Sequence, residues 1–404
     1  MKKSILLIAF DFPPCNSPGV ERTLRFAEHL QSLGWEPVVL TVNQSTFNTT
    51  IDNTFDDQFS FPVYRTFCLD VSKHFSYRGK YFGWMKQPDR YWGWLFTAIK
   101  EGLRLRKKHS INIIWSTYPL LTSHLIALVL SRLTKLPWLA DYRDPLQCYY
   151  DPSVYPSFKF HRWIDKQTIK LCRKAIFTSA GASKLYKTLY PEICSSKFTV
   201  IENGFETSLY NELNQVSNIV ISKKKHTMAH LGSLYENGRD PQTFFESLAL
   251  LKKRNVLDST NFELILVGAN NQHIYSQYTE SLGIDDIVSF YSQISHQESL
   301  KLSLSVDSLL IIQGAIFSAQ IPSKVYEYLS SNKAILAITN KLSDTSTLLT
   351  EYEGCYVAES KGEIYNACLD VTSTKSSFIR DHDRFSRWSR AKELAHLLAE
   401  TLKD

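Results

Sequence analysis

A lysine occupies an unfavourable position in the stretch IPSKVYEYLSSNKAIL, residues 321–336. Pro322 and the helical spacing of the apolar residues after it predict a helix that begins at Ser323. Lys324 then lies in the first turn, where free N–H groups and the positive end of the helix dipole disfavour a cation. A bound anion would reverse that effect, which makes Lys324 a candidate phosphate ligand.

A second basic side chain fits the same site. The segment LGSLYENGRDP follows a predicted strand at 226–232 and places Gly232, Ser233 and Arg239 at its carboxyl end. The planar fork of an arginine suits phosphate oxygens. The competing interpretation is that Lys324 merely pairs with Glu327, a contact worth about 0.2–0.5 kcal/mol on a helix surface. Glu327 could instead accept the hydroxyls of a ribose.

The first half of the chain also carries candidate polar residues. ADYRDP places Asp141, Arg143 and Asp144 at the carboxyl end of a predicted strand, with Asp141 and Arg143 on the same face. Arg143 could meet acceptor or phosphate anions, and Asp141 or Asp144 could orient an acceptor hydroxyl. The alternative is a buried Asp–Arg pair, with Asp144 capping a turn. His124 lies near the start of a helix expected to face this edge, although a lone helical histidine is more often structural.

Two doubly wound α/β domains would position these residues. At 404 residues the chain exceeds a single ordinary core. Apolar runs separated by helical patterns predict two parallel sheets, whose ligands bind beyond the carboxyl ends of the strands. We expect domains at 1–206 and 226–380, a connection at 207–225, and a C-terminal helix at 381–404 that packs toward the first domain. The predicted strands are 4–10, 37–42, 111–117, 137–142, 175–179 and 198–203, then 226–232, 262–268, 287–292, 307–313, 334–339 and 355–359.

Composition and motifs exclude several function classes. No GxGxxG follows the first strand, and no GxxxxGK[ST] motif occurs, which argues against a dinucleotide-binding enzyme and a P-loop NTPase. Seven scattered cysteines without zinc spacing fit a reducing cytoplasm. Neither a signal peptide nor a run of about 20 apolar residues is evident, so we expect a cytoplasmic protein that is soluble or peripheral on a membrane.

The chain resembles a known family. The segments DFPPCNSPGVERTLRFAEHLQSLGWEPVVLT, WSTYPLLTSHL, PWLADYRDP, VIENGFE, HLGSLYENGRDP and IPSKVYEYLSSNKAIL occur in the order and spacing of GT-B glycosyltransferases. They are most similar to the retaining GT4-type enzymes. The resemblance covers essentially the whole chain, and six motifs in order are a far more specific signal than any one of them.

The resemblance implies a role for each matching residue. The second domain would hold a nucleotide-diphosphate sugar, with Arg239 and Lys324 on the diphosphate and Glu327 on the ribose. Gly19, in the loop 11–19, would let the backbone approach the diphosphate. The first domain would bind a saccharide or lipid-linked saccharide acceptor in bacterial surface-polysaccharide synthesis. Retaining transfer in this family needs no protein base, and neither a metal nor another cofactor is expected.

One departure from the family pattern concerns the sugar. Where the family commonly has a glutamate that contacts sugar hydroxyls, eight positions before Glu327, this chain has Ala319. The backbone of the loop 314–320 could substitute. The sequence names neither the donor base, UDP or GDP, nor the sugar, acceptor or linkage. Two alternatives stay open: a nucleotide-sugar 2-epimerase of the same fold, and an inactive nucleotide-sugar-binding subunit.

The charge distribution suggests a further partner. Residues 1–205 carry 27 Lys and Arg against 16 acids, whereas the remainder carries 19 against 24. Residues 73–108 combine ten of these cations with nine interleaved aromatic residues. Such a segment suits an anionic membrane surface or, equally by chemistry, stacked bases. We favour the membrane because the family's acceptors are often lipid-linked, and we expect no nucleic acid. The competing interpretation is that these aromatics fill the core.

Overall fold

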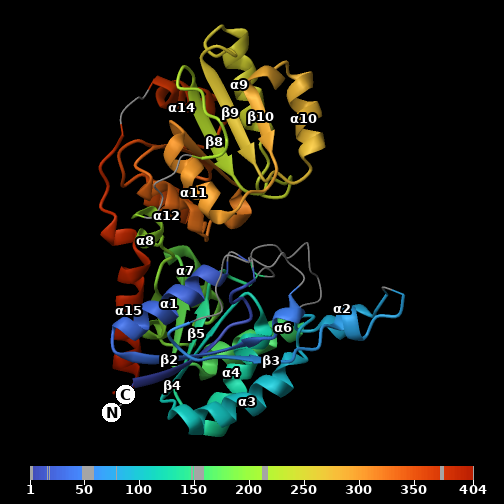
Figure 1. Ribbon diagram of the computed structural model, residues 1–404, viewed down its shortest axis with the longest axis vertical. Helices are drawn as coiled ribbons and strands as arrows, with labels where there is room; N and C mark the ends of the chain where they lie inside the picture. The colour runs from blue at the N-terminus through green and yellow to red at the C-terminus, as the bar shows by residue number, and fades with distance from the viewer. Residues whose placement is uncertain are drawn as a thin grey trace. The chain divides into compact units, whose positions relative to one another are not determined.

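The computed structural model describes residues 3–403 except 16, 18, 48–58, 79, 147–148, 150–158, 212–216 and 374–376. The chain divides into two compact units. The first comprises Met1–Asn203 together with Arg387–Asp404, and the second comprises Gly204–Ser386. Each is built on one parallel sheet with helices on both faces, which confirms the predicted α/β class (Figure 1).

The first unit contains a seven-stranded sheet in the order β3-β2-β1-β4-β5-β6-β7. Its strands are β1 (Lys3–Ile8), β2 (Trp35–Val42), β3 (Val63–Thr66), β4 (Ile113–Thr117), β5 (Trp138–Tyr142), β6 (Lys174–Phe177) and β7 (Phe198–Val200). Its helices are α1 (Val20–Ser32), α2 (Val71–His74), α3 (Trp94–His109), α4 (Leu121–Thr134), α6 (Lys159–Leu171), α7 (Ala180–Leu189) and α15 (Arg387–Thr401).

Apolar side chains on both faces of this sheet explain why its strands read as continuous hydrophobic runs. On one face, Leu6 and Ile8 of β1 pack with residues of α3 and α4. On the other, Ile5 of β1 and Leu24 of α1 pack in one cluster with Leu394 of α15. The C-terminal helix therefore completes the core of the first unit.

The second unit contains a six-stranded sheet in the order β10-β9-β8-β11-β12-β13. Its strands are β8 (His226–Leu231), β9 (Phe262–Val267), β10 (Val288–Tyr291), β11 (Ser308–Gln313), β12 (Ala334–Thr339) and β13 (Cys355–Ala358). Its helices are α8 (Thr207–Asn211), α9 (Gln242–Lys253), α10 (Gln272–Ser281), α11 (His296–Ser305), α12 (Ser323–Ser330), α13 (Asp344–Leu349) and α14 (Lys361–Ser373).

The strand orders fix where each sheet offers a binding site. In the first sheet the winding reverses between β1 and β4, and in the second it reverses between β8 and β11. Loops diverge at such switch points, which leaves room for a ligand at the carboxyl ends of the two strands. The segments after Ile8, Leu231 and Gln313 are therefore the places to look for function.

The twelve predicted strands all form, and the helix at α12 begins at Ser323 as predicted. The short strand β3 was not predicted. Residues 204–225 belong to the second unit, with 207–211 forming α8, and part of the predicted connection, 212–216, lies outside the described residues. In the described part of the chain, no helix combines the length and hydropathy needed to cross a membrane.

Candidate functional site

Two loops meet at the switch point of the second sheet. The loop after β8 carries Gly238, whose carbonyl accepts a 2.7 Å hydrogen bond from the N–H of Gly314 in the loop after β11. A β-carbon at Gly314 would lie 2.9 Å from the α-carbon of Gly238. The two backbones therefore touch, and only glycine allows this approach.

The helix α12 is fixed to the end of β8 by a buried tyrosine. The N–H of Leu231 donates to the hydroxyl of Tyr328 at 3.1 Å. Lys324 precedes Tyr328 by four residues and so lies on the same side of the helix, one turn toward its N-terminus. This bond brings the first turn of α12 over the carboxyl end of β8.

Lys324 fills the space above Gly232. A β-carbon built on Gly232 would lie 2.0 Å from the Lys324 Nζ, and Gly232 itself has φ +131°, a backbone conformation that side chains disfavour. Glycine is therefore required here both by its φ and by the position of the lysine. The sequence placed Lys324 and Gly232 in one site, and the structure brings them into contact.

The Lys324 ammonium is buried without a direct ion pair among the described residues. Burial lowers its pKa to about 8, with the charge of Glu327 opposing this shift and the charge of Arg239 adding to it. Among the described residues it makes no hydrogen bond and no ion pair within 4.0 Å. Burying a cation without a paired anion costs free energy, so this site is suited to bind an anion.

The expected alternative partner of Lys324 is engaged elsewhere. Glu327 lies 2.9 Å from the Nε2 of His296, at the start of α11, and its side chain is largely buried. A simple surface pair between Lys324 and Glu327 is therefore not what the structure contains. The carboxylate and the imidazole form one polar group beside the first turn of α12.

Arg239 is presented by a tight turn. The N–H groups of Tyr235 and Arg239 each donate to the other residue's carbonyl, at 3.2 and 3.0 Å. The guanidinium lies over the Tyr235 ring, 5.5 Å from its centroid. Ser233 and Ser323 lie at the start of this loop and of α12, so both belong to the same end of the sheet. Apart from Gly19, which belongs to the first unit, the sequence-predicted donor-side residues thus gather at one place in the second unit.

His230 is a site residue that sequence reasoning missed. Its Nδ1 lies 2.9 Å from the Leu310 carbonyl, while its Nε2 is buried without a hydrogen-bond partner among the described residues. Burial, followed by the charge of Lys324, lowers its pKa to about 3, so the ring is neutral. Its place two residues before Gly232, near the carboxyl end of a predicted strand, was the signal that could have identified it.

The loop that carries Ala319 is held rigidly. The Nε2 of Gln313, a buried residue, donates to the carbonyls of Phe317 and Gln320 at 2.8 and 2.9 Å. The carbonyl of Ser318 accepts a 2.8 Å bond from the N–H of Asp344. The backbone around Ala319 is consequently fixed at the carboxyl end of β11, beside Gly238.

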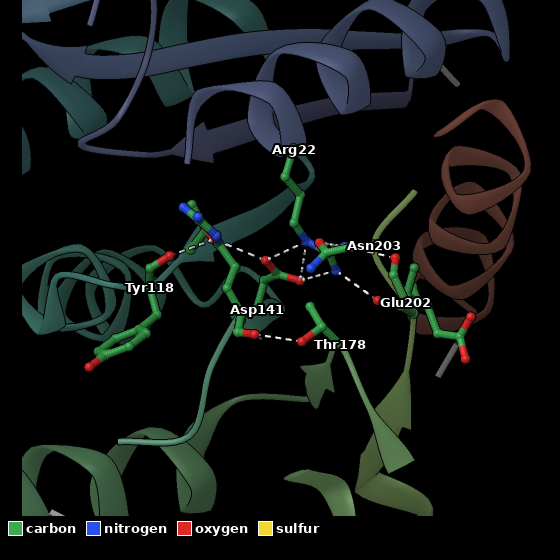
Figure 2. A network of polar contacts seen from close by, with 9 residues as sticks. Arg22, Tyr118, Asp141, Thr178, Glu202 and Asn203 are labelled. Atoms are coloured by element: carbon green, nitrogen blue, oxygen red, sulfur yellow. Dashed lines mark hydrogen bonds and ion pairs between the residues drawn. The ribbon is translucent and has the colours of Figure 1, made fainter. Parts of the chain in front are cut away.

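In the first unit, Asp141 forms a buried ion pair with a residue that the sequence did not suggest. The Arg22 Nη2 lies 2.7 Å from Asp141 Oδ1, and both side chains are buried (Figure 2). Thr117 donates a further 2.9 Å bond to Asp141. The same guanidinium donates to the carbonyls of Ile201 and Glu202. The buried Asp–Arg alternative is thus realised with Arg22, and Asp141 has no open face for an acceptor.

Arg143 instead lies beside the loop after β1. Its Nη1 is 3.9 Å from Asp11 Oδ2, and a β-carbon at Gly19 would lie 2.3 Å from both of these atoms. Ser17 donates to Asp11 at 2.9 Å and accepts from the Gly19 N–H at 3.2 Å. Gly19, Asp11 and Arg143 therefore form one polar cluster at the switch point of the first sheet. Asp11 was not predicted.

His124 does not face an open site. Its ring is fully buried, with Nδ1 2.8 Å from the Ser116 hydroxyl, which also accepts from the Trp138 indole. Burial lowers its pKa to about 3. The expectation that His124 faces a binding site at this edge of the sheet is therefore wrong, because Ser116 and the aromatic rings of the core surround it. Asp144 is half-exposed just beyond β5. Within the described residues, no cluster of three or more His, Cys, Asp or Glu could hold a metal.

Comparison with known proteins supports the fold. No model of a protein family and no curated protein sequence matches the chain. Solved structures do match over almost the full length. Anabaena HepE in complex with UDP and glucose is 15% identical over 98% of this chain and 100% of that one, with a TM-score of 0.66. Sucrose-phosphate synthase from Thermosynechococcus elongatus is 15% identical (100% and 97% covered, TM-score 0.61).

A third similar structure is WaaG, a glycosyltransferase involved in lipopolysaccharide biosynthesis. It is 13% identical over 98% of this chain and 95% of that one, with a TM-score of 0.59. At these identities the likeness establishes the architecture, and the chain has the two-domain GT-B fold. The chemistry has to be argued from this chain's own residues.

Proposed function

We propose that the chain is a glycosyltransferase that moves a sugar from a nucleotide-diphosphate sugar to a saccharide or lipid-linked saccharide acceptor, with retention and without a metal. The observation that carries the proposal is the buried Lys324 ammonium, which lies over Gly232, makes no direct ion pair among the described residues and feels the charge of Arg239. A diphosphate would supply the missing negative charge. The N–H groups at the start of α12 would add donors to it.

The donor-side residues then take distinct roles. Arg239 and Lys324 bind the diphosphate, with Ser233, Ser323 and the backbone at Gly232 around it. Glu327 accepts ribose hydroxyls and is oriented by His296. HepE is described in complex with UDP and with UDP-glucose, so we favour UDP as the donor nucleotide.

In the proposed reaction, the bond between the anomeric carbon and the diphosphate oxygen breaks as an acceptor hydroxyl adds on the same face. The acceptor proton passes to the departing diphosphate, so no protein base is required. Lys324 and Arg239 stabilise the charge that accumulates on the leaving group, and such electrostatic stabilisation is usually the largest catalytic contribution.

The acceptor role falls to the first unit. Arg143, with Asp11 beside it, presents its guanidinium at the switch point of the first sheet, and Gly19, whose N–H donates to Ser17, leaves the room that both side chains need. Asp144 is the remaining candidate for orienting an acceptor hydroxyl. Asp141 is better described as a positioning residue, because Arg22 and Thr117 occupy its oxygens. For the sugar, the fixed backbone around Ala319 takes the place of the missing glutamate side chain.

A lipid-linked acceptor would place the protein at the inner face of a cell membrane. WaaG, similar in fold, acts in lipopolysaccharide biosynthesis, which supports an acceptor of this kind. The epimerase and the inactive subunit remain as alternatives, and an assay separates them. Turnover of the nucleotide sugar without added acceptor would indicate the epimerase, and binding without any turnover would indicate the inactive subunit.

The first test is calorimetry of the purified chain with UDP and with GDP in the presence of EDTA. We expect one nucleotide to bind, and Lys324→Ala to weaken binding about tenfold or more, equivalent to 1.4 kcal/mol. Lys253→Ala is the matched control, because it removes an exposed lysine at the end of α9. Absence of binding, or equal affinity in Lys324→Ala, would refute the proposed donor site.

A further inference from the structure

The segment between β3 and α3 exposes large aromatic side chains. Of the aromatics at 73–108, Trp94 is buried in the core, as the competing interpretation anticipated. Tyr77, Phe82 and Trp84 are more than 70% exposed, and Phe75 is 42% exposed. Figure 1 shows this segment, which includes α2, projecting from the rest of the first unit. Water-exposed rings in this number need an explanation beyond packing.

A second segment adds to the same surface. Helix α6 exposes Phe160 and Trp163, whose rings stack at 5.9 Å with an interplanar angle of 7°. Between them, His161 forms a hydrogen bond with the backbone of Pro88, which follows the exposed Phe82 and Trp84. The contact joins two segments about 75 residues apart in the chain. We call this the aromatic surface, defined by Phe75, Tyr77, Phe82, Trp84, Phe160 and Trp163.

The acidic residues of these segments are turned inward. Asp70 pairs with Arg90 at 3.1 Å and caps α2, and Asp89 accepts two bonds from Thr122 at the start of α4. Asp165 of α6 is fully buried, where tyrosine hydroxyls donate to its carboxylate. Among the described residues of these two segments, the exposed charges are therefore cationic. They include Lys73, Arg78, Lys80, Lys86, Arg162 and Lys166.

The same inward contacts hold the segment in place. The N–H of Val71 donates to the Arg90 carbonyl at 3.0 Å, which closes the base of the projection. The indole of Trp92 donates to the Met85 carbonyl at 2.8 Å and braces the turn that presents Trp84. Asp89 fastens the segment to α4. The rings are thus exposed on a fixed support, which lowers the entropic cost of binding through them.

We propose that the aromatic surface docks on an anionic lipid bilayer. Trp, Tyr and Phe rings partition into the headgroup region, where their apolar bodies leave water, and the surrounding Lys and Arg side chains meet lipid phosphates. Nucleic-acid stacking platforms generally line a charged groove that follows the strand. Here the rings stand on a projection, and Phe160 and Trp163 already stack on each other, so a flat membrane interface fits better.

This inference rests on the proposed function only for its purpose, which is to bring the acceptor domain to a lipid-linked substrate. Membrane binding is measured without nucleotide or acceptor. The protein could therefore bind nucleotide at Lys324 without binding membranes, or bind membranes without binding nucleotide, and the two experiments distinguish these outcomes.

The test is co-sedimentation of the full chain with vesicles of phosphatidylcholine alone and of phosphatidylcholine mixed with phosphatidylglycerol. We expect binding to need phosphatidylglycerol and to weaken as salt is raised. Phe82→Ser/Trp84→Ser should weaken it by about tenfold or more. Trp163→Ser alone should also weaken it, because α6 belongs to the same surface. UDP affinity should be unchanged in each variant, and an unchanged urea denaturation curve shows that the first unit keeps its fold.

The matched control is Leu342→Ser/Ile379→Ser, which removes two highly exposed apolar side chains from the second unit. This variant should bind vesicles like the wild type. The proposal is overturned if the wild type ignores both vesicles, if Phe82→Ser/Trp84→Ser binds as well as the wild type, or if phosphatidylcholine alone binds equally. Binding of a single-stranded RNA oligonucleotide through Trp84, without vesicle binding, would assign the surface to nucleic acid instead.

Discussion

The Arg22 guanidinium lies 2.7 Å from the Asp141 carboxylate, and neither side chain reaches solvent. The same guanidinium donates 3.0 Å bonds to the carbonyls of Ile201 and Glu202, which directly precede Asn203, the last residue before the chain enters the second unit. One side chain therefore fixes β5, α1 and the exit from the first unit together. This pair is part of the scaffold that positions Arg143 and Asp144.

Removing one partner of this pair should be costly. Asp141→Asn or Arg22→Met leaves the other charge buried and unpaired, and we expect the free energy of unfolding to fall by about 3–5 kcal/mol. Urea denaturation followed by tryptophan fluorescence measures the loss. Because these residues belong to the first unit, UDP affinity should change little as long as the chain stays folded.

The double variant Arg22→Met/Asp141→Leu provides the control. With both charges gone, no ion is left unpaired, and this variant should be more stable than either single variant. Additive losses in the double variant would contradict the interpretation that an unpaired buried charge is the cause.

Gly232→Ala should displace the Lys324 ammonium from its position over residue 232. The added β-carbon would meet the Lys324 Nζ at 2.0 Å, and φ +131° strains any side chain. We expect UDP binding to weaken by at least about tenfold, measured by calorimetry. Gly283→Ala is the matched control, since Gly283 has φ +67° but open space around it. It should lose about 1 kcal/mol of stability and keep its UDP affinity.

The charge of Lys324 predicts how nucleotide binding depends on pH. With a pKa lowered to about 8, the free site begins to lose its positive charge near that pH rather than near 10.5. UDP affinity should therefore fall as pH rises through about 8, and the fall should be absent in Lys324→Ala. Titrations at several pH values measure this, and parallel pH profiles for the two proteins would contradict it.

The same lysine affects stability with a defined sign. Between pH 8 and 10.5 the unfolded chain binds a proton at Lys324 that the folded protein has released. The contribution of Lys324 to the free energy of unfolding should therefore increase with pH across that interval. Lys324→Met removes the buried ammonium, so its free energy of unfolding should exceed that of the wild type below pH 8. This excess should shrink as the pH rises from 8 to 10.5.

Glu327 should distinguish ribose from deoxyribose. A carboxylate that accepts sugar hydroxyls loses a partner when the 2′-hydroxyl is absent, so the wild type should bind UDP more tightly than 2′-deoxy-UDP. In Glu327→Ala the two affinities should converge. His296→Ala should reduce the preference partly, because His296 hydrogen-bonds Glu327 at 2.9 Å. An unchanged preference in Glu327→Ala would remove the ribose assignment.

Much of this architecture could be predicted because its signals are local. Strands buried on both faces read as apolar runs, and Lys324 was conspicuous because a cation in the first turn of a helix conflicts with its own backbone. Strand β3 escaped notice because its four residues are only half-buried and show no clear pattern. His230 was overlooked since a histidine at the end of an apolar strand reads as ordinary core.

The missed contacts join residues far apart in the chain. Arg22 and Asp141 are separated by 119 positions, and nothing in the local pattern around Arg22 marks it as buried. The pairing of Asp11 with Arg143, and of α6 with the segment at Pro88, likewise depends on how the chain folds back. His124 was misjudged for the same reason, because the core that surrounds it comes from other strands.

The helix α15 gives the first unit a discontinuous origin in the sequence, and this has a consequence for biosynthesis. Ala391, Leu394 and Leu398 cover the same apolar cluster as Ile5, Leu24 and Leu30, yet they are translated after the whole of Gly204–Ser386. On the ribosome the second unit can therefore finish folding while one face of the first sheet still awaits its last helix. That face is where we expect a nascent-chain chaperone to act.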